Sequence, residues 1–180
     1  PPKPRLLDAG CGTGLLTRYL ARRFPASEIC AFDIDAGMLA EMERMIAGER
    51  FEKNVIIARG DLRDPGRLED MKTGQPLFIP RDYFDAVCVS GALEHVPLAE
   101  SVERLAKLLK PGGIFFNLGV RRSPAGAVLG MVYRFRPYRV AEMRRALAEA
   151  GLDRIRVLRL GLEDFPANLS RIAFVARKKY

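Results

Sequence analysis

Residues 6–14 read LLDAGCGTG, an apolar run that ends in Asp8 and continues into Gly10, Gly12 and Gly14. The residues that follow have helical periodicity, with apolar side chains on one face. A strand that turns this tightly into a helix points backbone N–H groups and the positive end of the helix at whatever lies across the strand tip. The stretch therefore predicts a strand, a glycine turn and a helix beside a ligand. The side chains expected to face inward on this helix are Leu15, Leu16, Tyr19, Leu20 and Phe24.

The alternation of strands and helices continues along the chain. Strands that are apolar on both faces and separated by helices favour a parallel sheet with helices on either side. Between the third and fourth strands we expect a short helix, and we expect the PGG of residues 111–113 to stop the helix before it. Further strands are predicted at residues 28–34, 54–61, 84–90, 114–120, 152–160 and 170–178, and helices at 36–48, 65–74, 98–110 and 139–151.

The chain is long enough for one domain with a sizeable core, at 180 residues of which 48% are apolar. We find no linker, so residues 1–180 are expected to form a single domain. No run approaches the roughly 18 to 20 apolar residues that span a bilayer, and Cys11, Cys30 and Cys88 are too far apart for a disulfide framework or a zinc site. These features favour a soluble, cytoplasmic protein. The chain begins without Met, immediately before its first expected strand, which leaves room for residues upstream.

Glycine-rich turns of this kind serve several classes of ligand. A Walker loop for phosphate requires a Lys after its last glycine, and none follows here. The dinucleotide fingerprint is Gly-x-Gly-x-x-Gly, whereas the third glycine here comes one residue early, at Gly14. The spacing Asp-x-Gly-x-Gly-x-Gly instead resembles the first motif of class I S-adenosylmethionine-dependent methyltransferases.

Four later segments resemble the same family in the same order. They read AFDID, RGDL, FDAVCVSGALEHV and LAKLLKPGGIFF, and with the glycine turn they extend the resemblance over residues 4–120. The resemblance implies an α/β fold, a Rossmann-like three-layer sandwich with a mostly parallel seven-stranded sheet whose last strand is antiparallel. The two late strands would be the sixth and seventh. In this family the segment upstream of the first strand includes part of a lid.

The resemblance also implies S-adenosylmethionine as cofactor and S-adenosylhomocysteine as product. Asp8 would meet the ammonium group while the bare glycine backbone touches the methionine portion. Asp33 lies 19 residues after Gly14, close to the roughly 20-residue offset at which an acid accepts the ribose hydroxyls. Asp35 is the rival acid, but it fits better as a helix N-cap. The expected cofactor-binding residues are Asp8, Gly10, Cys11, Gly12, Gly14, Asp33, Ile34, Asp61, Leu62 and Ser90, with Asp61 near the adenine amino group or simply a loop acid.

His95 is the one histidine, and it follows the fourth strand, where the methyl group would be presented. It is a candidate for a general base or for a group that orients the acceptor. The alternative is a framework role, in which His95 and Glu94 satisfy nearby loop backbone. A related ExxEH pattern accompanies a divalent metal in coenzyme Q type O-methyltransferases, but its first acid would fall on Gly91. We therefore expect no metal.

The acceptor side is predicted from charge and position. Residues 121–180 carry 14 Lys and Arg against 5 Asp and Glu, whereas residues 1–120 carry 16 against 17. Residues 121–139 lie where this family usually builds its acceptor pocket, and their apolar centre has arginines on both sides. This suits an anionic or amphipathic small molecule or an anionic membrane surface. The alternative is a helix that covers the core while its arginines face water. The candidate acceptor-binding residues are Arg121, Tyr133, Arg136 and Tyr138.

The leading hypothesis is methyl transfer to O, N or an activated carbon of a small molecule. Base methylation of nucleic acid is disfavoured, because SGAL of residues 90–93 stands where amine-modifying enzymes have Asn/Asp-Pro-Pro-aromatic, and no Pro-Cys occurs. An RNA methyltransferase that uses the basic final third remains an alternative. A third possibility is a protein that binds the cofactor without transferring its methyl group.

Overall fold

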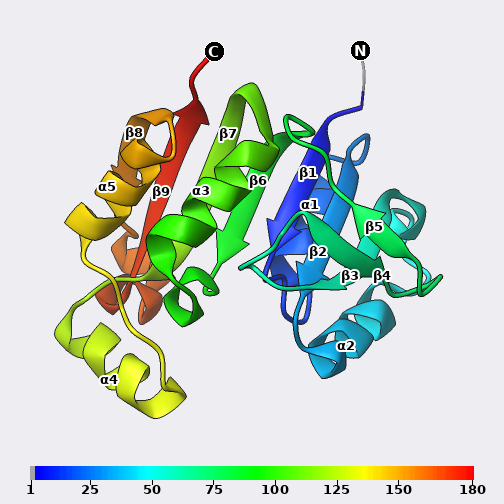
Figure 1. Cartoon of the computed structure of the whole chain (residues 1–180). Helices are drawn as coiled ribbons and strands as arrows, with labels where there is room; N and C mark the ends of the chain where they lie inside the picture. Colours follow the sequence, from blue (N-terminus) through cyan, green and yellow to red (C-terminus); the bar gives the residue numbers. More distant parts are fainter. Residues whose placement is uncertain (1–2) are drawn as a thin grey trace.

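The computed structural model describes residues 3–180, and its central feature is a nine-stranded sheet (Figure 1). The strands are β1 Arg5–Ala9, β2 Glu28–Asp33, β3 Val55–Gly60, β4 Arg67–Asp70, β5 Pro76–Phe78, β6 Phe84–Ser90, β7 Leu109–Val120, β8 Leu152–Leu158 and β9 Arg171–Lys178. The α-helices are α1 Leu15–Arg23, α2 Ala36–Ile46, α3 Leu98–Leu108, α4 Pro124–Tyr133 and α5 Val140–Glu149. Four short 3-10 helices are η1 Glu52–Asn54, η2 Leu93–His95, η3 Leu162–Asp164 and η4 Ala167–Leu169.

The strand order is β5-β4-β3-β2-β1-β6-β7-β9-β8. Strands β3, β2, β1, β6 and β7 run parallel, and β9 is antiparallel to both of its neighbours, β7 and β8. The predicted α/β class, the parallel sheet and the antiparallel late strand are confirmed. The predicted number of seven strands is wrong, because β4 and β5 add a hairpin at the β3 edge.

The hairpin replaces the short helix expected at residues 65–74. Strand β4 pairs antiparallel with β3, which gives hydrogen-bond partners to a backbone edge that would otherwise be open, and it buries Leu68. Oδ1 of Asp70 accepts hydrogen bonds from the backbone N–H groups of Lys72 and Thr73, both at 2.9 Å, and Gly74 closes the turn with φ +66°. The turn residues that suggested a helix end therefore form a hairpin.

Two further expectations are wrong in detail. The PGG of residues 111–113 lies inside β7, because α3 already ends at Leu108 and the chain enters the strand at Leu109. Helix α1 buries Thr17, Leu20 and Ala21, and it leaves Leu15, Tyr19 and Phe24 exposed. The Thr17 hydroxyl is drawn inward because it donates a hydrogen bond to the buried Asp8 carboxylate at 2.5 Å. This hydrogen bond turns the helix away from the face that hydrophobicity alone selects.

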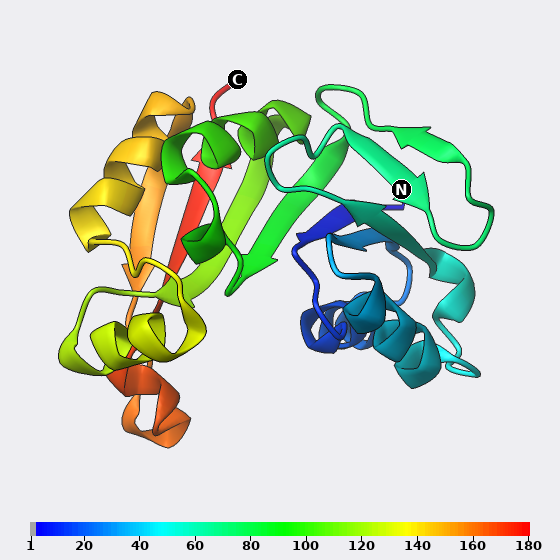
Figure 2. The same cartoon turned by 60° about the horizontal axis from the view of Figure 1, so that its bottom comes forward.

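The sheet has helices on both faces (Figures 1 and 2). Helices α3 and α5 pack on one face around the large core that includes Phe84, Phe115 and Phe174, and α1 and α2 pack on the other face. Helix α4 instead lies at the carboxyl edge of the strands, away from both layers (Figure 1, lower left). Among residues 3–180, no helix is long and apolar enough to cross a membrane.

Candidate active site

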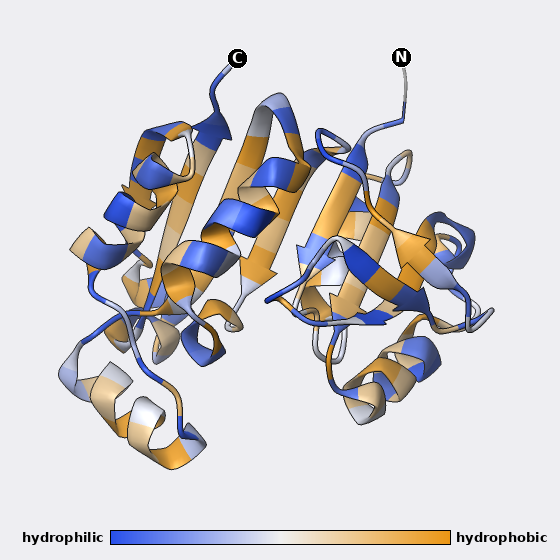
Figure 3. Ribbon diagram, in the orientation of Figure 1, coloured by the Kyte–Doolittle hydropathy of each residue, from blue (hydrophilic) through white to orange (hydrophobic). Residues whose placement is uncertain are grey.

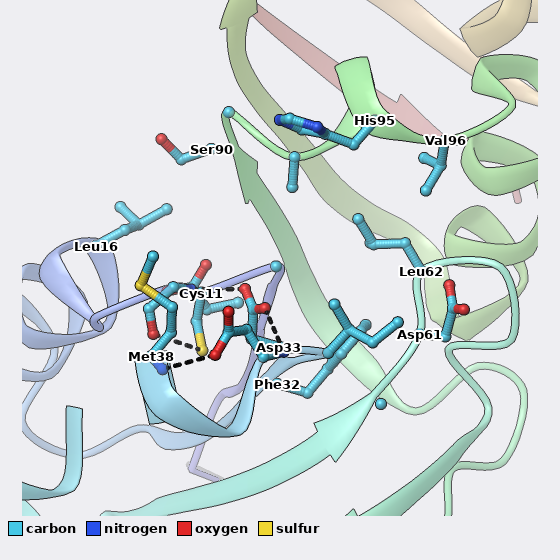
Figure 4. Close-up of a pocket in the computed structure, with 18 of the residues that line it drawn as sticks. Cys11, Leu16, Phe32, Asp33, Met38, Asp61, Leu62, Ser90, His95 and Val96 are labelled. Carbon is cyan, nitrogen blue, oxygen red and sulfur yellow. Dashed lines mark hydrogen bonds between the residues drawn. The ribbon is translucent and has the colours of Figure 1, made fainter. Parts of the chain in front are cut away.

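A cavity of about 690 Å3 opens at the carboxyl ends of β1, β2 and β6 (Figure 4). In open α/β sheets this crevice outside the strand ends is where ligands bind. Its volume is in the range of small-molecule sites. It is lined by Asp8, Gly10, Cys11, Gly12, Thr13, Leu15, Leu16, Phe32, Asp33, Ile34, Asp35, Met38, Gly60, Asp61, Leu62, Arg63, Ser90, Gly91, Ala92, His95 and Val96.

The three glycines of the first motif have different roles. All three have positive φ, which L side chains rarely adopt. A Cβ on Gly10 would collide with Ala92, and one on Gly14 would lie 2.5 Å from Cγ of Met42, so these two glycines allow close packing. A Cβ on Gly12 would meet no atom within 4 Å, because Gly12 faces the cavity. Gly12 is therefore the position where a ligand can approach bare backbone.

Asp33 ends β2 and is tied to the glycine turn. Its Oδ2 accepts a hydrogen bond from the backbone N–H of Gly12 at 2.9 Å, and its Oδ1 accepts one from the N–H of Asp35 at 3.0 Å. Asp35 is the N-cap of α2, as expected, since its side chain accepts from the N–H groups of Gly37 and Met38. Both acids line the cavity, but only Asp35 caps the helix, which is the structural role that the sequence indicated for it.

Asp8 lies beneath the glycine turn and is fully buried. Burial raises the pKa of its carboxyl from 3.8 to about 6, although the hydrogen bond from Thr17 opposes the rise. Oδ2 accepts from that hydroxyl, but Oδ1 has no hydrogen-bond partner among residues 3–180. A buried carboxylate oxygen without a donor, in the wall of a cavity, favours a cationic or N–H donor group on the ligand.

Cys11 also lines the cavity, but its thiol does not have the surroundings of a reactive cysteine. Burial is the main cause that raises its pKa, and the nearby Asp8 and Asp33 raise it further. The sulfur lies 3.7 Å from Sδ of Met42. The group that Cys11 contributes to the cavity wall is therefore a protonated, apolar thiol.

The opposite wall comes from the chain after β3. Leu62 is buried, and Asp61 forms an ion pair with Arg63 at 2.7 Å that lowers the pKa of the Asp61 carboxyl, chiefly through the hydrogen bonds from Arg63. Ile34 and Met38 leave large apolar side chains exposed toward the same space. The cavity thus combines an acid and bare backbone at one end with apolar side chains along its length.

His95 is in η2, directly after β6, and its exposed ring lines the cavity opposite Asp33 (Figure 4). The ring meets that of Phe135 edge-on, with 5.2 Å between the centroids. The preceding Glu94 is buried and does not line the cavity; its Oε1 accepts from the backbone N–H of Val120, and burial raises the pKa of its carboxyl. Glu94 therefore satisfies a backbone N–H at the end of β7, whereas His95 faces the cavity.

The four candidate acceptor residues do not line this cavity. Tyr138 is buried in the core, where its hydroxyl accepts a hydrogen bond from Nδ2 of Asn117 at 2.6 Å. Tyr133 is exposed at the end of α4, and Arg136 forms an ion pair with Glu142 at 3.2 Å. The guanidinium of Arg121 lies near two backbone carbonyls of the η4 segment.

Three residues near the site were not singled out from the sequence. Leu16 and Met38 were assigned to buried helix faces, but their positions in the first turns after β1 and β2 bring them into the cavity wall. Arg171 begins β9, and its Nη1 lies 3.6 Å from the position of a Cβ on Gly91, which lines the cavity. No local pattern marks Arg171, because only the pairing of β9 with β7 brings it there.

Within residues 3–180, no group of three or more His, Cys, Asp or Glu side chains is arranged to hold a metal ion. Cys11, Cys30 and Cys88 are free and buried.

Comparison with known proteins identifies the family. A family model described as a methyltransferase domain matches residues 7–115, which include the glycine turn, Asp33, Asp61 and His95. The chain belongs to the class I S-adenosylmethionine-dependent methyltransferases.

Two curated relatives illustrate how much of a longer protein this chain matches. It is 36% identical over 132 residues to a ubiquinone biosynthesis O-methyltransferase from Xanthomonas campestris, covering 73% of this chain and 49% of the relative. It is 37% identical over 113 residues to an uncharacterised protein from Synechococcus, covering 62% of this chain and 24% of that protein. The chain therefore spans less than half the length of these relatives.

A solved structure extends the likeness in fold. The geranyl diphosphate C-methyltransferase of Streptomyces coelicolor, crystallised with Mg2+, geranyl-S-thiolodiphosphate and S-adenosylhomocysteine, superposes with a TM-score of 0.79 at 16% identity. The match covers 98% of the methyltransferase chain and 70% of that structure. At this identity the likeness concerns the fold.

Proposed function

We propose that this chain transfers the methyl group of S-adenosylmethionine to a small-molecule acceptor at an oxygen, nitrogen or activated carbon atom. One observation carries the proposal: a single cavity is lined by Asp8, Gly12 and Asp33 and, on the side away from Asp33, by Ser90 and His95 (Figure 4). The first group matches a nucleoside linked to an amino acid, and the second leaves room for an acceptor.

The residues present fit this cofactor. The unpartnered Oδ1 of Asp8 would receive the ammonium group, and the open space over Gly12 would admit the methionine backbone. Asp33 would accept the ribose hydroxyls, and Ile34, Met38 and Leu62 supply apolar contacts for the adenine. When bound, S-adenosylmethionine supplies an electrophilic methyl group on a positively charged sulfur.

The chain's own contribution to such a reaction is alignment and exclusion of water. Ser90 and His95 lie on the side of the cavity away from Asp33 and would orient the acceptor. If the acceptor is a hydroxyl group, its proton has to leave, and the His95 ring is the candidate base. The edge-on contact with Phe135 would help to hold that ring in position.

The acceptor proposed here is anionic. Arg171 is half-buried next to Gly91. Burial raises the pKa of the nearby Glu94 carboxyl, and the charge of Arg171 opposes that rise. Among residues 3–180, however, no carboxylate oxygen lies within 4.0 Å of its guanidinium. A guanidinium without a salt-bridge contact beside Gly91 favours a carboxylate or phosphate on the ligand.

The test has two stages. Calorimetry should show one S-adenosylhomocysteine bound per chain, with weaker binding by Asp33→Ala and unchanged binding by Arg50→Gln, because Arg50 is exposed and does not line the cavity. Tritiated S-adenosylmethionine is then supplied with 3,4-dihydroxybenzoate, with catechol, with a protein-free small-molecule extract and with bulk tRNA. We expect label in the small-molecule fraction, and a lower kcat/KM for dihydroxybenzoate but not for catechol in Arg171→Gln.

Label in tRNA would replace the proposal with the RNA alternative. Cofactor binding with no transfer to any small-molecule fraction would favour a binding protein without transferase activity. Absence of S-adenosylhomocysteine binding would overturn the proposal at its first step.

A further inference from the structure

Helix α4, Pro124–Tyr133, has an unusual composition for its position. Its sequence is PAGAVLGMVY, which contains no charged side chain. Nevertheless it lies on the surface, and only Gly126 and Gly130 are buried, so that its larger side chains point outward. A surface helix normally presents polar residues to water. Figure 3 shows α4 without a hydrophilic face along its length.

A second exposed apolar segment lies beside α4. Oγ of Ser123, the N-cap of α4, donates a hydrogen bond to the backbone carbonyl of Leu169 at 3.0 Å, and η3 and η4 follow the same edge of the molecule (Figure 2). We call the large exposed side chains of the two segments the α4 patch. Their exposed fractions run from 50% to 89%, which is far from the burial usual for such residues. The patch comprises Val128, Met131, Val132, Tyr133, Leu162, Phe165 and Leu169.

Arginines surround the α4 patch. Arg122, Arg134 and Arg139 flank α4 in the sequence and are exposed, and among residues 3–180 none of them has a carboxylate within ion-pair distance. Arg136 is paired with Glu142. The η3 segment also contains two acids, Glu163 and Asp164, and the Asp164 carboxylate accepts from the backbone N–H of Gly161. The border of the patch is therefore mainly cationic.

We propose that the α4 patch docks on an anionic lipid bilayer. Stable peripheral binding takes two signals. Here the apolar side chains would enter the boundary of the acyl chains, and the arginines at the border of the patch would reach the headgroup phosphates. Ten helical residues span about 15 Å, so α4 can lie in the interface but is too short to cross the hydrocarbon core of about 30 Å. This inference goes beyond the proposed methyl transfer.

Charge favours the bilayer over a second copy of the chain. A two-fold contact would bring the same patch against itself and place the unpaired arginines near one another. An anionic membrane instead offers them phosphates. Helix α4 also lies at the carboxyl edge of the strands (Figures 1 and 2), and the cavity opens at the same edge. Docking would therefore bring this edge toward the membrane, where acceptors with an apolar body are dissolved.

The test is flotation with vesicles of phosphatidylcholine alone and of phosphatidylcholine mixed with phosphatidylglycerol. We expect binding to the mixed vesicles, weakened by salt. Met131→Glu/Val132→Glu should lower the partition coefficient about tenfold or more, whereas Phe78→Glu, which replaces an equally exposed side chain on β5, should leave it unchanged. Arg122→Gln/Arg134→Gln should lower it several-fold for each charge, and Arg50→Gln/Arg81→Gln should not.

Every variant is checked by its unfolding midpoint and by its affinity for S-adenosylhomocysteine, both of which should stay unchanged. If the glutamate pair does not fold, Met131→Ser/Val132→Ser takes its place. No binding to the mixed vesicles, equal binding to phosphatidylcholine alone, or an equal loss in Phe78→Glu would overturn the proposal. A dimer in sedimentation equilibrium without lipid, dissociated by the Met131/Val132 substitutions, would assign the patch to a second copy.

Discussion

The backbone N–H of Gly12 donates a hydrogen bond to Oδ2 of Asp33 at 2.9 Å, which joins the glycine turn after β1 to the end of β2. The same carboxylate accepts from the N–H of Asp35 through Oδ1. Asp33 therefore fixes the glycine turn and the start of α2 relative to each other. Substituting Asp33 would therefore change both a contact to the ligand and the conformation of the glycine turn that Asp33 holds.

Asp33→Ala is expected to weaken binding of S-adenosylhomocysteine by about 1 to 3 kcal/mol, because hydrogen bonds from the ribose to a charged group are lost. Asp33→Asn should lose less, since its amide oxygen can still accept from the Gly12 N–H. Asp35→Ala is the comparison variant: it removes the N-cap of α2 and should cost about 1 kcal/mol of folding stability. Asp35 also lines the cavity, but its carboxylate is occupied by the N–H groups of Gly37 and Met38, so its loss of affinity should be smaller than that of Asp33→Ala. Calorimetry and denaturant unfolding measure the two effects. If Asp33→Ala binds S-adenosylhomocysteine as tightly as wild type does, the ribose does not bind at Asp33.

Gly12→Ala is expected to reduce cofactor affinity more than stability. The added methyl group meets no protein atom, so the folding cost is the strain of a positive φ, about 1 to 2 kcal/mol. Gly48→Ala carries the same strain at φ +76° with equally open space outside the cavity, and it should match that loss of stability without changing affinity. Thermal unfolding and titration with S-adenosylhomocysteine compare the two variants. If they bind equally well, Gly12 does not face the ligand.

Gly14→Ala is expected to behave in the opposite way. Its Cβ would lie 2.5 Å from Cγ and 2.9 Å from Sδ of Met42, and Gly14 itself does not line the cavity. Gly14→Ala should therefore lower the free energy of unfolding more than Gly12→Ala does. Combining Gly14→Ala with Met42→Ala should cost less than the sum of the two single substitutions, because the shorter side chain at position 42 relieves the clash. The measurement is the free energy of unfolding of the two single variants and the double variant. An additive double variant would show that no clash occurs.

The first motif could be predicted from the sequence because its information is local. The spacing of Asp8 and the three glycines, and the offset to Asp33, depend on one strand, one turn and the next strand tip, and all of these residues except Gly14 line the cavity. Parallel strands bring their carboxyl ends to one edge, which is why His95, directly after the fourth predicted strand, lies beside the same cavity. Asp61 and Ser90 were expected from the family resemblance of their segments, and both line the cavity. The fold class was predictable for the same reason.

The sequence predicted less well wherever pairing or a specific hydrogen bond overrides periodicity. The β4–β5 hairpin forms because the β3 edge needs partners, and helix α1 turns because Thr17 bonds to Asp8. Arg171 comes near the cavity only through its pairing opposite Val120 in a late antiparallel strand. Tyr138 was assigned to the acceptor from its neighbours in the chain, but the structure buries it against Asn117.

Because of Asp8, we expect cofactor affinity and folding stability to change in opposite directions with pH. Burial raises the pKa of this carboxyl from 3.8 to about 6. Between these two pKa values the folded chain binds the proton more tightly than the unfolded chain does. The contribution of Asp8 to the free energy of unfolding is therefore largest at low pH and falls as the pH rises toward 6, by about 3 kcal/mol in all. Binding of an ammonium group requires the ionised form, so affinity should instead rise toward pH 6 and then level off.

The measurement is S-adenosylhomocysteine affinity and the free energy of unfolding from pH 4.5 to 7.5, compared between wild type and Asp8→Asn. The difference between the two proteins isolates Asp8 from the other acids that titrate in this range. Asp8→Asn should be more stable than wild type at pH 7 and should bind with a flatter pH dependence. If the S-adenosylhomocysteine affinity of the two proteins depends on pH in the same way, Asp8 does not bind the ammonium group.

Glu94 provides a test of framework against catalysis in the segment that holds His95. Its buried Oε1 accepts from the Val120 N–H, Oε2 has no hydrogen-bond partner among residues 3–180, and burial raises the pKa of the carboxyl. A raised pKa in an acid means that the charged form is destabilising near neutrality and that this cost disappears as the pH falls. Glu94→Gln keeps an oxygen for Val120 and removes the charge, so its stability at pH 7 should equal or exceed that of wild type. Glu94→Ala leaves the Val120 N–H without a partner and should cost about 1 to 3 kcal/mol.

Turnover separates this role from that of the neighbouring histidine. Because Glu94 holds the loop through Val120 and does not line the cavity, Glu94→Gln should keep kcat near that of wild type. His95→Gln should leave stability and S-adenosylhomocysteine affinity unchanged but should lower kcat, because its exposed ring faces the acceptor side. The two variants are compared by unfolding at pH 7 and by methyl transfer to 3,4-dihydroxybenzoate. A histidine variant that transfers methyl groups at the wild-type rate would assign His95 to the framework together with Glu94.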